Sequence, residues 1–222
     1  MKYLRNSMFA IVLVLAMSAG AWAQMMGRGT SAPQIPGIFK PEVGSGSEYM
    51  VTTKQGPMDI QYAVVGKESV DGREGFWQEI RIKSGKGSGM VMKQLFVTAG
   101  DSPGIKRMIM QAPGQQAMEM PMGMMGGMMQ HMAQQAPKNP TEAAQELGGK
   151  VGTETITVPA GTFVCDHYRT KNGSDVWISS KVYPYGLVKS SSKEMTIELQ
   201  KVLSDQTSEI KGEVRKLEMP HF

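Results

Sequence analysis

Short runs in which apolar and polar residues alternate recur along most of this 222-residue chain. From Ser47 onward the runs are rich in β-branched and aromatic residues, and Gly, Pro, Asp or Asn separates one from the next. Because successive side chains of a strand point to opposite faces, this pattern predicts an antiparallel β-meander. The predicted strands are 47–53, 58–66, 75–83, 89–97, 105–111, 151–158, 161–170, 174–182, 186–191 and 194–203.

Helix signals are few. Asn139-Pro140-Thr141-Glu142 offers an N-cap and a proline at the first helical position, and Gly148-Gly149 offers a stop, which together predict one short helix at 140–147. Residues 112–139 interrupt the strand pattern with Met, Pro, Gly and Gln. So long a segment without regular structure indicates a functional loop, a lid or a disordered insertion.

The connection between the second and third predicted strands decides their register. If Val70-Asp71-Gly72 forms a three-residue loop with Gly72 in the left-handed conformation, Tyr62 lies opposite Ile80 and Ile60 opposite Ile82. A two-residue Asp-Gly turn would instead place Tyr62 opposite Arg81 and Ile60 opposite Lys83, which mixes the two faces. The apolar pattern therefore predicts the three-residue loop.

A second hairpin is indicated by Asn172-Gly173, which is typical of a two-residue type I′ turn. This turn predicts that Tyr168 lies opposite Trp177 and His167 opposite Ile178. A three-residue loop over 171–173 is the alternative. Apolar residues then occur on both faces of the hairpin, so both faces need a cover, either a bound ligand or another part of the chain.

The N-terminus has the three parts of a secretory leader. Lys2 and Arg5 form its positive region, Met8 to Met17 its apolar region, and Ala21-Trp22-Ala23 the small-residue cleavage pattern. The apolar run is shorter than the roughly 20 residues needed to span a bilayer, so no permanent membrane span is expected. We expect cleavage after Ala23 and a periplasmic or secreted protein.

Removal of Lys2 and Arg5 with the leader lowers the formal net charge from +4 to about +2. Basic residues do not cluster, so a nucleic-acid partner is not expected. Cys165 is the only cysteine, which excludes an internal disulfide. The predicted division is a leader (1–23), a flexible tether (24–46), a β-domain (47–203) and a polar tail (204–222), whose strand or disordered state is open.

Ten of the 21 methionines lie between Met108 and Met132. Methionine is a flexible apolar side chain whose thioether is a soft ligand for Cu(I). The tract is therefore interpreted as an adaptable apolar lid, with Cu(I) sequestration as the alternative and biased composition as a third possibility. The candidate copper ligands are Met118, Met120, Met122, Met124, Met125, Met128, Met129, His131 and Met132, and Glu119 is a further harder ligand for Cu(II).

Catalytic signals are weak. Cys165 and His167 share one face of a predicted strand, as a nucleophile and base or two metal ligands would, but a lone cysteine among apolar residues is more often a buried hydrophobe. The chain has no Gly-rich phosphate loop, nucleophile elbow or HExxH motif. We therefore expect no enzymatic activity and no resident cofactor, copper being the alternative.

The stretch Val158-Pro-Ala-Gly-Thr-Phe-Val-Cys165, then Tyr168, Val176-Trp-Ile-Ser179 and Tyr183-Pro-Tyr-Gly-Leu-Val-Lys189, resembles a group of secreted bacterial domains. Their architecture is related to that of the periplasmic lipoprotein localisation factors. The resemblance implies an unclosed half-barrel whose concave face, beneath helices or loops, holds an acyl chain or hydrophobic peptide. The chain departs from that family in lacking a lipoprotein cysteine and in having a Met tract where a carrier has helical lids.

The expected fold is mainly β, an antiparallel meander curled into an unclosed half-barrel with one short helix and a Met-rich loop. The expected function is binding of a hydrophobic small molecule, a lipidated protein or another envelope partner. The candidate ligand-binding residues on the concave face are Tyr62, Trp77, Tyr168 and Trp177.

Overall fold

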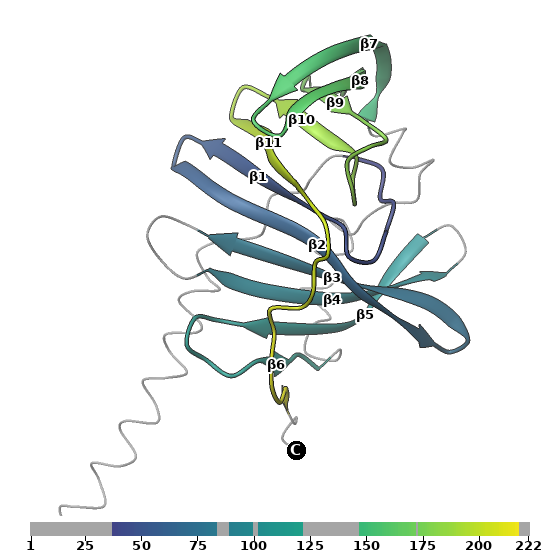
Figure 1. Cartoon of the computed structure of the whole chain (residues 1–222), viewed down its shortest axis with the longest axis vertical. Coiled ribbons are helices and arrows are strands. Elements are labelled where there is room, and N and C mark those ends of the chain that lie inside the picture. Colours follow the sequence, from purple (N-terminus) through teal and green to yellow (C-terminus); the bar gives the residue numbers. More distant parts are fainter. Residues whose placement is uncertain (1–36, 84–88, 100–101, 122–146, 172, 218–222) are drawn as a thin grey trace, which may run out of the picture. The chain divides into compact units, whose positions relative to one another are not determined.

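Twelve strands form one continuous sheet in the described part of the chain, which comprises residues 37–83, 89–99, 102–121, 147–171 and 173–217 of a computed structural model (Figure 1). The strands are β1 (Gly46–Thr53), β2 (Gly56–Val70), β3 (Arg73–Lys83), β4 (Met90–Ala99), β5 (Ser102–Gln111), β6 (Met118–Glu119), β7 (Gly149–Val158), β8 (Gly161–Arg169), β9 (Asp175–Ile178), β10 (Leu187–Ser191), β11 (Met195–Leu203) and β12 (Arg215–Lys216). Their order is β12-β6-β5-β4-β3-β2-β1-β11-β10-β9-β8-β7.

The predicted mainly-β, unclosed architecture is confirmed. Among the described strands, the end strands β12 and β7 do not pair with each other, so the sheet that they form has two edges. Within the described ranges every element is a strand, and no helix long and apolar enough to cross a membrane occurs there. The predicted helix at 140–147 lies outside the described residues except for Leu147, and the predicted leader lies outside them entirely.

The hairpin of β2 and β3 combines both registers considered from the sequence. Ile60 lies opposite Ile82 and Tyr62 opposite Ile80, as predicted. The predicted three-residue loop is wrong, because Val70 pairs with Arg73 across a two-residue turn whose Asp71 and Gly72 have φ angles of 52° and 73°. A β-bulge between Val64 and Gly66 takes up the extra residue and restores the apolar pairing.

The hairpin of β8 and β9 adopts the alternative three-residue loop. Gly173 has a φ of 76°, and its N–H donates to the carbonyl of Thr170 at 2.9 Å. The predicted type I′ register is therefore wrong by one residue: His167, rather than Tyr168, lies opposite Trp177. Strand β9 is also shorter than the predicted 174–182, because the chain turns after Ile178, where Val182 N–H donates to the Ser179 carbonyl at 3.2 Å.

The sheet bends toward the face that carries Tyr49, Tyr62 and Gln78, which we call the inner face. Tyr185, in the connection between β9 and β10, reaches across this face, and its ring lies 5.4 Å from that of Tyr62. At the far end, β7 contacts β10 and β11 (Figure 1). These contacts between strands that are distant in the sheet order show that the inner face is concave.

Residues 37–46 do not behave as the predicted flexible tether. Ile38 N–H donates to the carbonyl of Tyr185 at 3.0 Å, and Lys40 N–H to that of Pro184. The ring of Phe39 packs 5.4 Å from Tyr185 and 5.9 Å from Phe96. The end of the predicted tether is thus part of the cover of the inner face.

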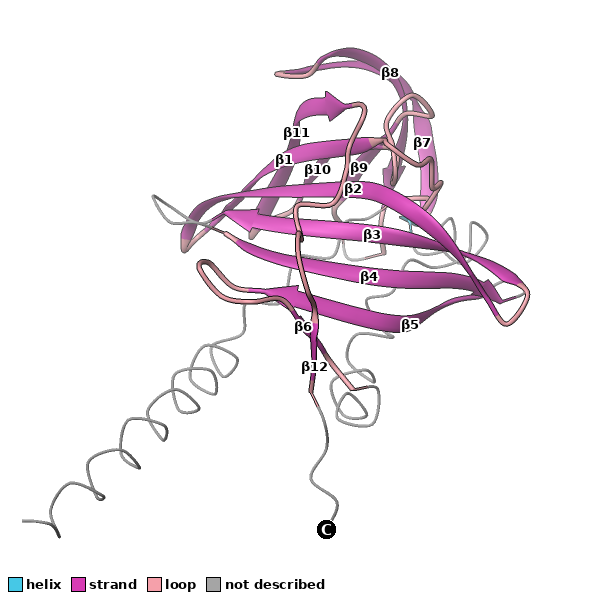
Figure 2. Ribbon diagram, turned by 60° about the horizontal axis from the view of Figure 1, so that its bottom comes forward, coloured by secondary structure: helices cyan, strands magenta, loops and turns pink. Residues whose placement is uncertain are grey.

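The opposite, outer face is crossed by the segment after β11, residues 204–217, which we call the strap (Figure 2). Ile210 of the strap packs into an apolar cluster of the sheet that includes Trp77 and Leu95. The strap ends in β12, which pairs in parallel with β6. The state of the tail, left open by the sequence, is therefore an ordered crossing with one short strand as far as residue 217.

Candidate functional site

The inner face around Tyr62 is filled by aromatic side chains of the protein itself. Tyr49 and Tyr62 meet edge to face at 6.2 Å, and Tyr62 meets Tyr185 in the same way. Phe39 and Phe96 extend the group. This part of the concave face is therefore a packed core.

The hydroxyl groups of this core are also satisfied. Tyr49 donates to the carbonyl of Leu187 at 3.1 Å, and Tyr185 exchanges hydrogen bonds with the amide of Gln78 at 2.8 and 3.1 Å. Burial raises the pKa of Tyr49, Tyr62 and Tyr185 well above the ordinary tyrosine value, because a phenolate loses its hydration there.

The structure does not bring the four predicted ligand-binding side chains together. Tyr62 lies opposite Ile80, whereas Trp77 is three residues before Ile80 and so points to the outer face. Tyr168 lies opposite Val176, and its neighbour His167 lies opposite Trp177, so Tyr168 and Trp177 also occupy different faces. In each of the two hairpins, the tyrosine and the tryptophan predicted to bind the ligand therefore lie on opposite faces of the sheet.

Trp77 is enclosed on the outer face by charged groups. Its indole N–H donates to Glu68 Oε2 at 2.9 Å. The Lys93 ammonium lies 4.9 Å from the ring centroid and the Arg107 guanidinium 5.1 Å from it. Trp77 is only 8% exposed, and its role here is to anchor the outer face beneath the strap.

The part of the inner face formed by β4, β5 and β6 carries methionines at neighbouring positions. Met92 lies opposite Met110, and Met110 lies opposite Met118. In the adjacent row, Met120 N–H donates to the Met108 carbonyl at 2.9 Å. Including Met90, which lies opposite Ile82, the residues of this methionine surface are Met90, Met92, Met108, Met110, Met118 and Met120.

Most of this surface lies outside the candidate ligands predicted from the Met-rich tract, because Met90, Met92, Met108 and Met110 belong to strands β4 and β5. A signal was nevertheless present: Met90-Val91-Met92 and Met108-Ile109-Met110 place methionines two residues apart, hence on one face of each strand. What the sequence could not supply is the pairing of β4 with β5, which aligns the two motifs.

Only Met118 and Met120 of the predicted copper ligands lie in the described part of the chain. Met122, Met124, Met125, Met128, Met129, His131 and Met132 lie outside it, as does most of the predicted lid. Glu119 faces away from Met118 and binds Arg107 through both carboxylate oxygens, at 2.7 and 3.2 Å. This contact lowers the pKa of Glu119.

Cys165 and His167 share a face, as predicted, but they are not hydrogen-bonded to each other. The Cys165 thiol donates to the carbonyl of Phe163 at 3.6 Å. His167 Nδ1 lies 2.8 Å from Glu154 Oε1 and Nε2 lies 2.8 Å from Asp175 Oδ1. Both ring nitrogens therefore have carboxylate partners.

These contacts join the three edge strands β7, β8 and β9. The His167 ring stacks on Trp177 at 4.7 Å, and the Trp177 N–H donates to Glu154 Oε2 at 3.0 Å. Hydrogen bonds from Trp177 and His167 lower the pKa of Glu154, and those from His167 and Arg169 lower the pKa of Asp175. The cluster is a structural brace at this edge of the sheet.

Cys165 is expected to be an unreactive thiol in the folded protein. It is 1% exposed, and burial raises its pKa to about 11, so little thiolate exists at neutral pH. We expect a thiol-specific chromogenic disulfide reagent at pH 8 to label Cys165 at least 100-fold more slowly in the native chain than in urea. Equal rates in both conditions would contradict this placement.

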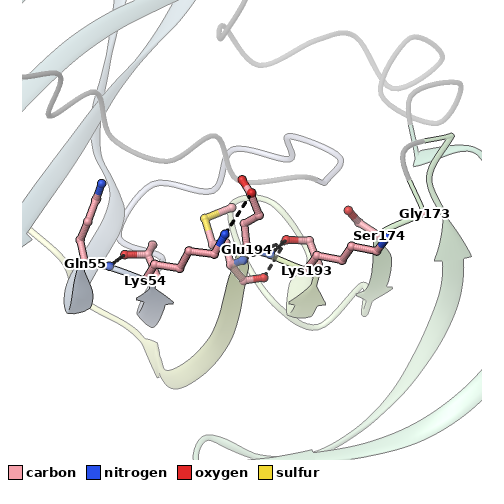
Figure 3. A pocket seen from close by; sticks show the side chains of 9 residues that line it. Lys54, Gln55, Gly173, Ser174, Lys193 and Glu194 are labelled. Carbon is pink, nitrogen blue, oxygen red and sulfur yellow. Dashed lines mark hydrogen bonds and ion pairs between the residues drawn. The ribbon is translucent and has the colours of Figure 1, made fainter.

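A separate cleft of about 570 Å³ opens between three turns of the sheet (Figure 3). Its lining residues are Thr53, Lys54, Gln55, Gly173, Ser174, Ser192, Lys193, Glu194 and Met195. Lys54 and Glu194 form an exposed ion pair across it at 3.4 Å. Ligand sites are mostly lined by hydrophobic and aromatic side chains with a few placed polar groups. Polar and charged residue types predominate around this cleft, and it contains none of the predicted ligand-binding residues.

Comparison with known proteins gives distant similarity only. No known protein family matches the chain, and no curated protein sequence does. The chain is similar to the crystal structure of a protein from Parabacteroides distasonis ATCC 8503 designated a lipoprotein, with 12% identity, a TM-score of 0.35, and coverage of 76% of this chain and 100% of that one. It is also similar to the crystal structure of a protein from Bacteroides fragilis NCTC 9343 designated an exported protein with a YmcC-like fold. The identity is 12% and the TM-score 0.35, and the match covers 76% of this chain and 99% of that one.

Proposed function

We propose that this chain is an exported, non-enzymatic binding protein, and that its methionine surface holds an acyl chain, either of a lipid or of a lipidated protein. Export is inferred from the leader-like N-terminus. The carrier-like role is inferred from the unclosed, bent sheet. The acyl-chain ligand is inferred from the six methionines that lie together on the inner face of β4, β5 and β6.

The chemistry of this surface suits a flexible apolar ligand. Methionine side chains have three rotatable bonds and adapt to irregular apolar shapes, as an acyl chain requires. Met90, Met118 and Met120 are partly exposed, whereas the aromatic part of the inner face is closed by its own side chains. The proposed ligand site is therefore displaced from Tyr62 toward the β6 end of the sheet.

A fluorescent long-chain fatty acid added to the mature chain tests this proposal. We expect the wild type to bind it, and Met118→Glu or Met120→Glu to weaken binding by about ten-fold, since an unpaired carboxylate at an apolar contact costs more than 1.4 kcal/mol. Lys106→Glu, at an exposed position of β5, is the matched control and leaves binding unchanged. Circular dichroism verifies that each variant is folded.

Two outcomes would refute the acyl-chain site. One is a wild-type chain that takes up no fatty acid and carries no lipid when examined by native mass spectrometry after gentle purification. The other is undiminished binding by the folded Met118→Glu and Met120→Glu variants.

A further inference from the structure

Three thioethers lie in a single row across the inner face. Met92 is the direct cross-strand partner of Met110, and Met110 is the direct partner of Met118. Side chains at such opposite positions have Cβ atoms only about 4.5–5.5 Å apart. The pairing of β4, β5 and β6 thus brings three methionine side chains side by side, although Met92 and Met118 are 26 residues apart in the sequence.

One polar side chain contacts a sulfur atom of this row. Gln94 Nε2 lies 3.3 Å from Met92 Sδ, so this sulfur already engages a polar partner on the inner face. Met92 is 8% and Met110 7% exposed, and Met118 is half-buried. The row therefore grades from a sheltered end at β4 to an accessible end at β6.

We propose that Met92, Met110 and Met118 bind one Cu(I) ion through their three thioethers. Thioethers are soft neutral ligands, which favour Cu(I) over the hard divalent cations. The described residues contain no group of three His, Cys, Asp or Glu side chains that could hold a metal ion. Glu119, the nearest carboxylate in sequence to Met118, is on the outer face with Arg107.

This site differs from the copper alternative drawn from the sequence, which relied on residues 118–132. It also goes beyond the acyl-chain proposal and does not depend on it. Leucine retains the apolar surface of methionine and lacks the sulfur, so leucine substitution separates the two activities.

Competition between the mature chain and the Cu(I) chelator bicinchoninate, under anaerobic reducing conditions, tests the site. We expect the triple variant Met92→Leu, Met110→Leu, Met118→Leu to bind Cu(I) at least about ten-fold more weakly than the wild type, because a Cu(I) site needs about three such ligands. The matched control is Met50→Leu, Met58→Leu, Met195→Leu, which changes three strand methionines outside the row and leaves affinity unchanged.

A second measurement keeps the proposal testable if the triple variant does not fold. In wild-type protein with ¹³C-labelled methionine methyl groups, the redox-inert ion Ag(I) should shift the resonances of Met92, Met110 and Met118 and leave those of Met50, Met58 and Met195 in place. Unchanged Cu(I) affinity in a folded triple variant, or Ag(I) shifts confined to other methionines, would overturn the site. Continued fatty-acid binding by the triple variant would show that loss of copper is independent of the acyl-chain function.

Discussion

Replacement of Glu79 by alanine is expected to lower the free energy of unfolding by about 3–5 kcal/mol, because it removes the closest carboxylate partner of a buried cation, Arg81. Glu79 is fully buried on the outer face, beneath the strap. Its carboxylate accepts hydrogen bonds from Arg81 Nε at 2.9 Å, from Ser208 Oγ at 2.6 Å and from the Glu209 N–H at 2.8 Å.

The expected loss of stability exceeds that of one ion pair, because the Glu79 carboxylate also accepts hydrogen bonds from the strap. Arg81, 5% exposed, also donates to Gln206 Oε1 and to the Thr207 carbonyl. Without Glu79 the guanidinium keeps these two neutral acceptors and a longer contact of 3.4 Å to Glu209. We therefore expect residues 206–210 to detach in part, exposing the apolar cluster around Trp77.

Urea unfolding followed by tryptophan fluorescence measures this effect. The matched control is Glu74→Ala, on the same strand, whose carboxylate pairs with Lys67 at 3.0 Å at the exposed surface. That change should cost less than about 1 kcal/mol. If Glu79→Ala were no more destabilising than Glu74→Ala, the Glu79–Arg81 pair would not be what secures the strap.

The second large effect is unfolding in alkaline solution. Burial raises the pKa of Tyr49, Tyr62 and Tyr185 above the unfolded value of about 10. The stability contributed by these neutral phenols is fully present below pH 10 and is lost as the pH rises, by about 1.4 kcal/mol per pH unit for each buried tyrosine. With three such groups, we expect cooperative unfolding above about pH 11.

Tyrosinate absorbance and circular dichroism recorded on the same samples test this prediction. The ionisation of the buried tyrosines should coincide with the loss of β-structure, whereas in concentrated urea all tyrosines should ionise near pH 10. Tyr49→Phe removes one ionisable group and should raise the alkaline midpoint, although loss of the bond to Leu187 costs about 1 kcal/mol at neutral pH. Full tyrosine ionisation before any loss of structure would contradict the prediction.

Local pairing in this protein could be predicted because it depends on neighbouring residues. Alternation of apolar and polar side chains located ten of the twelve described strands, and the pairing of Tyr62 with Ile80 followed from the apolar pattern. The two hairpin loops were predicted less well. An Asp-Gly turn with a distant bulge and a three-residue loop with one glycine differ in energy by little, and the turn residues alone do not distinguish them.

The candidate site depended on contacts between distant segments. Trp77 and Trp177 look like ligand-contacting aromatics in the sequence, but the first is enclosed by Lys93 and Arg107 and the second stacks on His167. The strands β6 and β12 have two residues each and no periodicity to detect. They form by pairing with other segments: β6 pairs with β5, and β12, at the end of the strap, pairs with β6.

By itself, the sequence determined that the chain forms a β-meander, where along the chain most strands lie, and which residues alternate along each strand, since these properties arise from side-chain periodicity and turn chemistry. Only the tertiary structure decided that β1 pairs with β11, that the inner aromatic core is closed by Tyr185 and Phe39, and that the strap covers Glu79. Those outcomes depend on pairings between segments more than a hundred residues apart, such as Glu79 with Ser208. No local sequence pattern specifies which distant surfaces will meet, because burial, sheet bending and charge pairing depend on one another and form together when the whole chain folds.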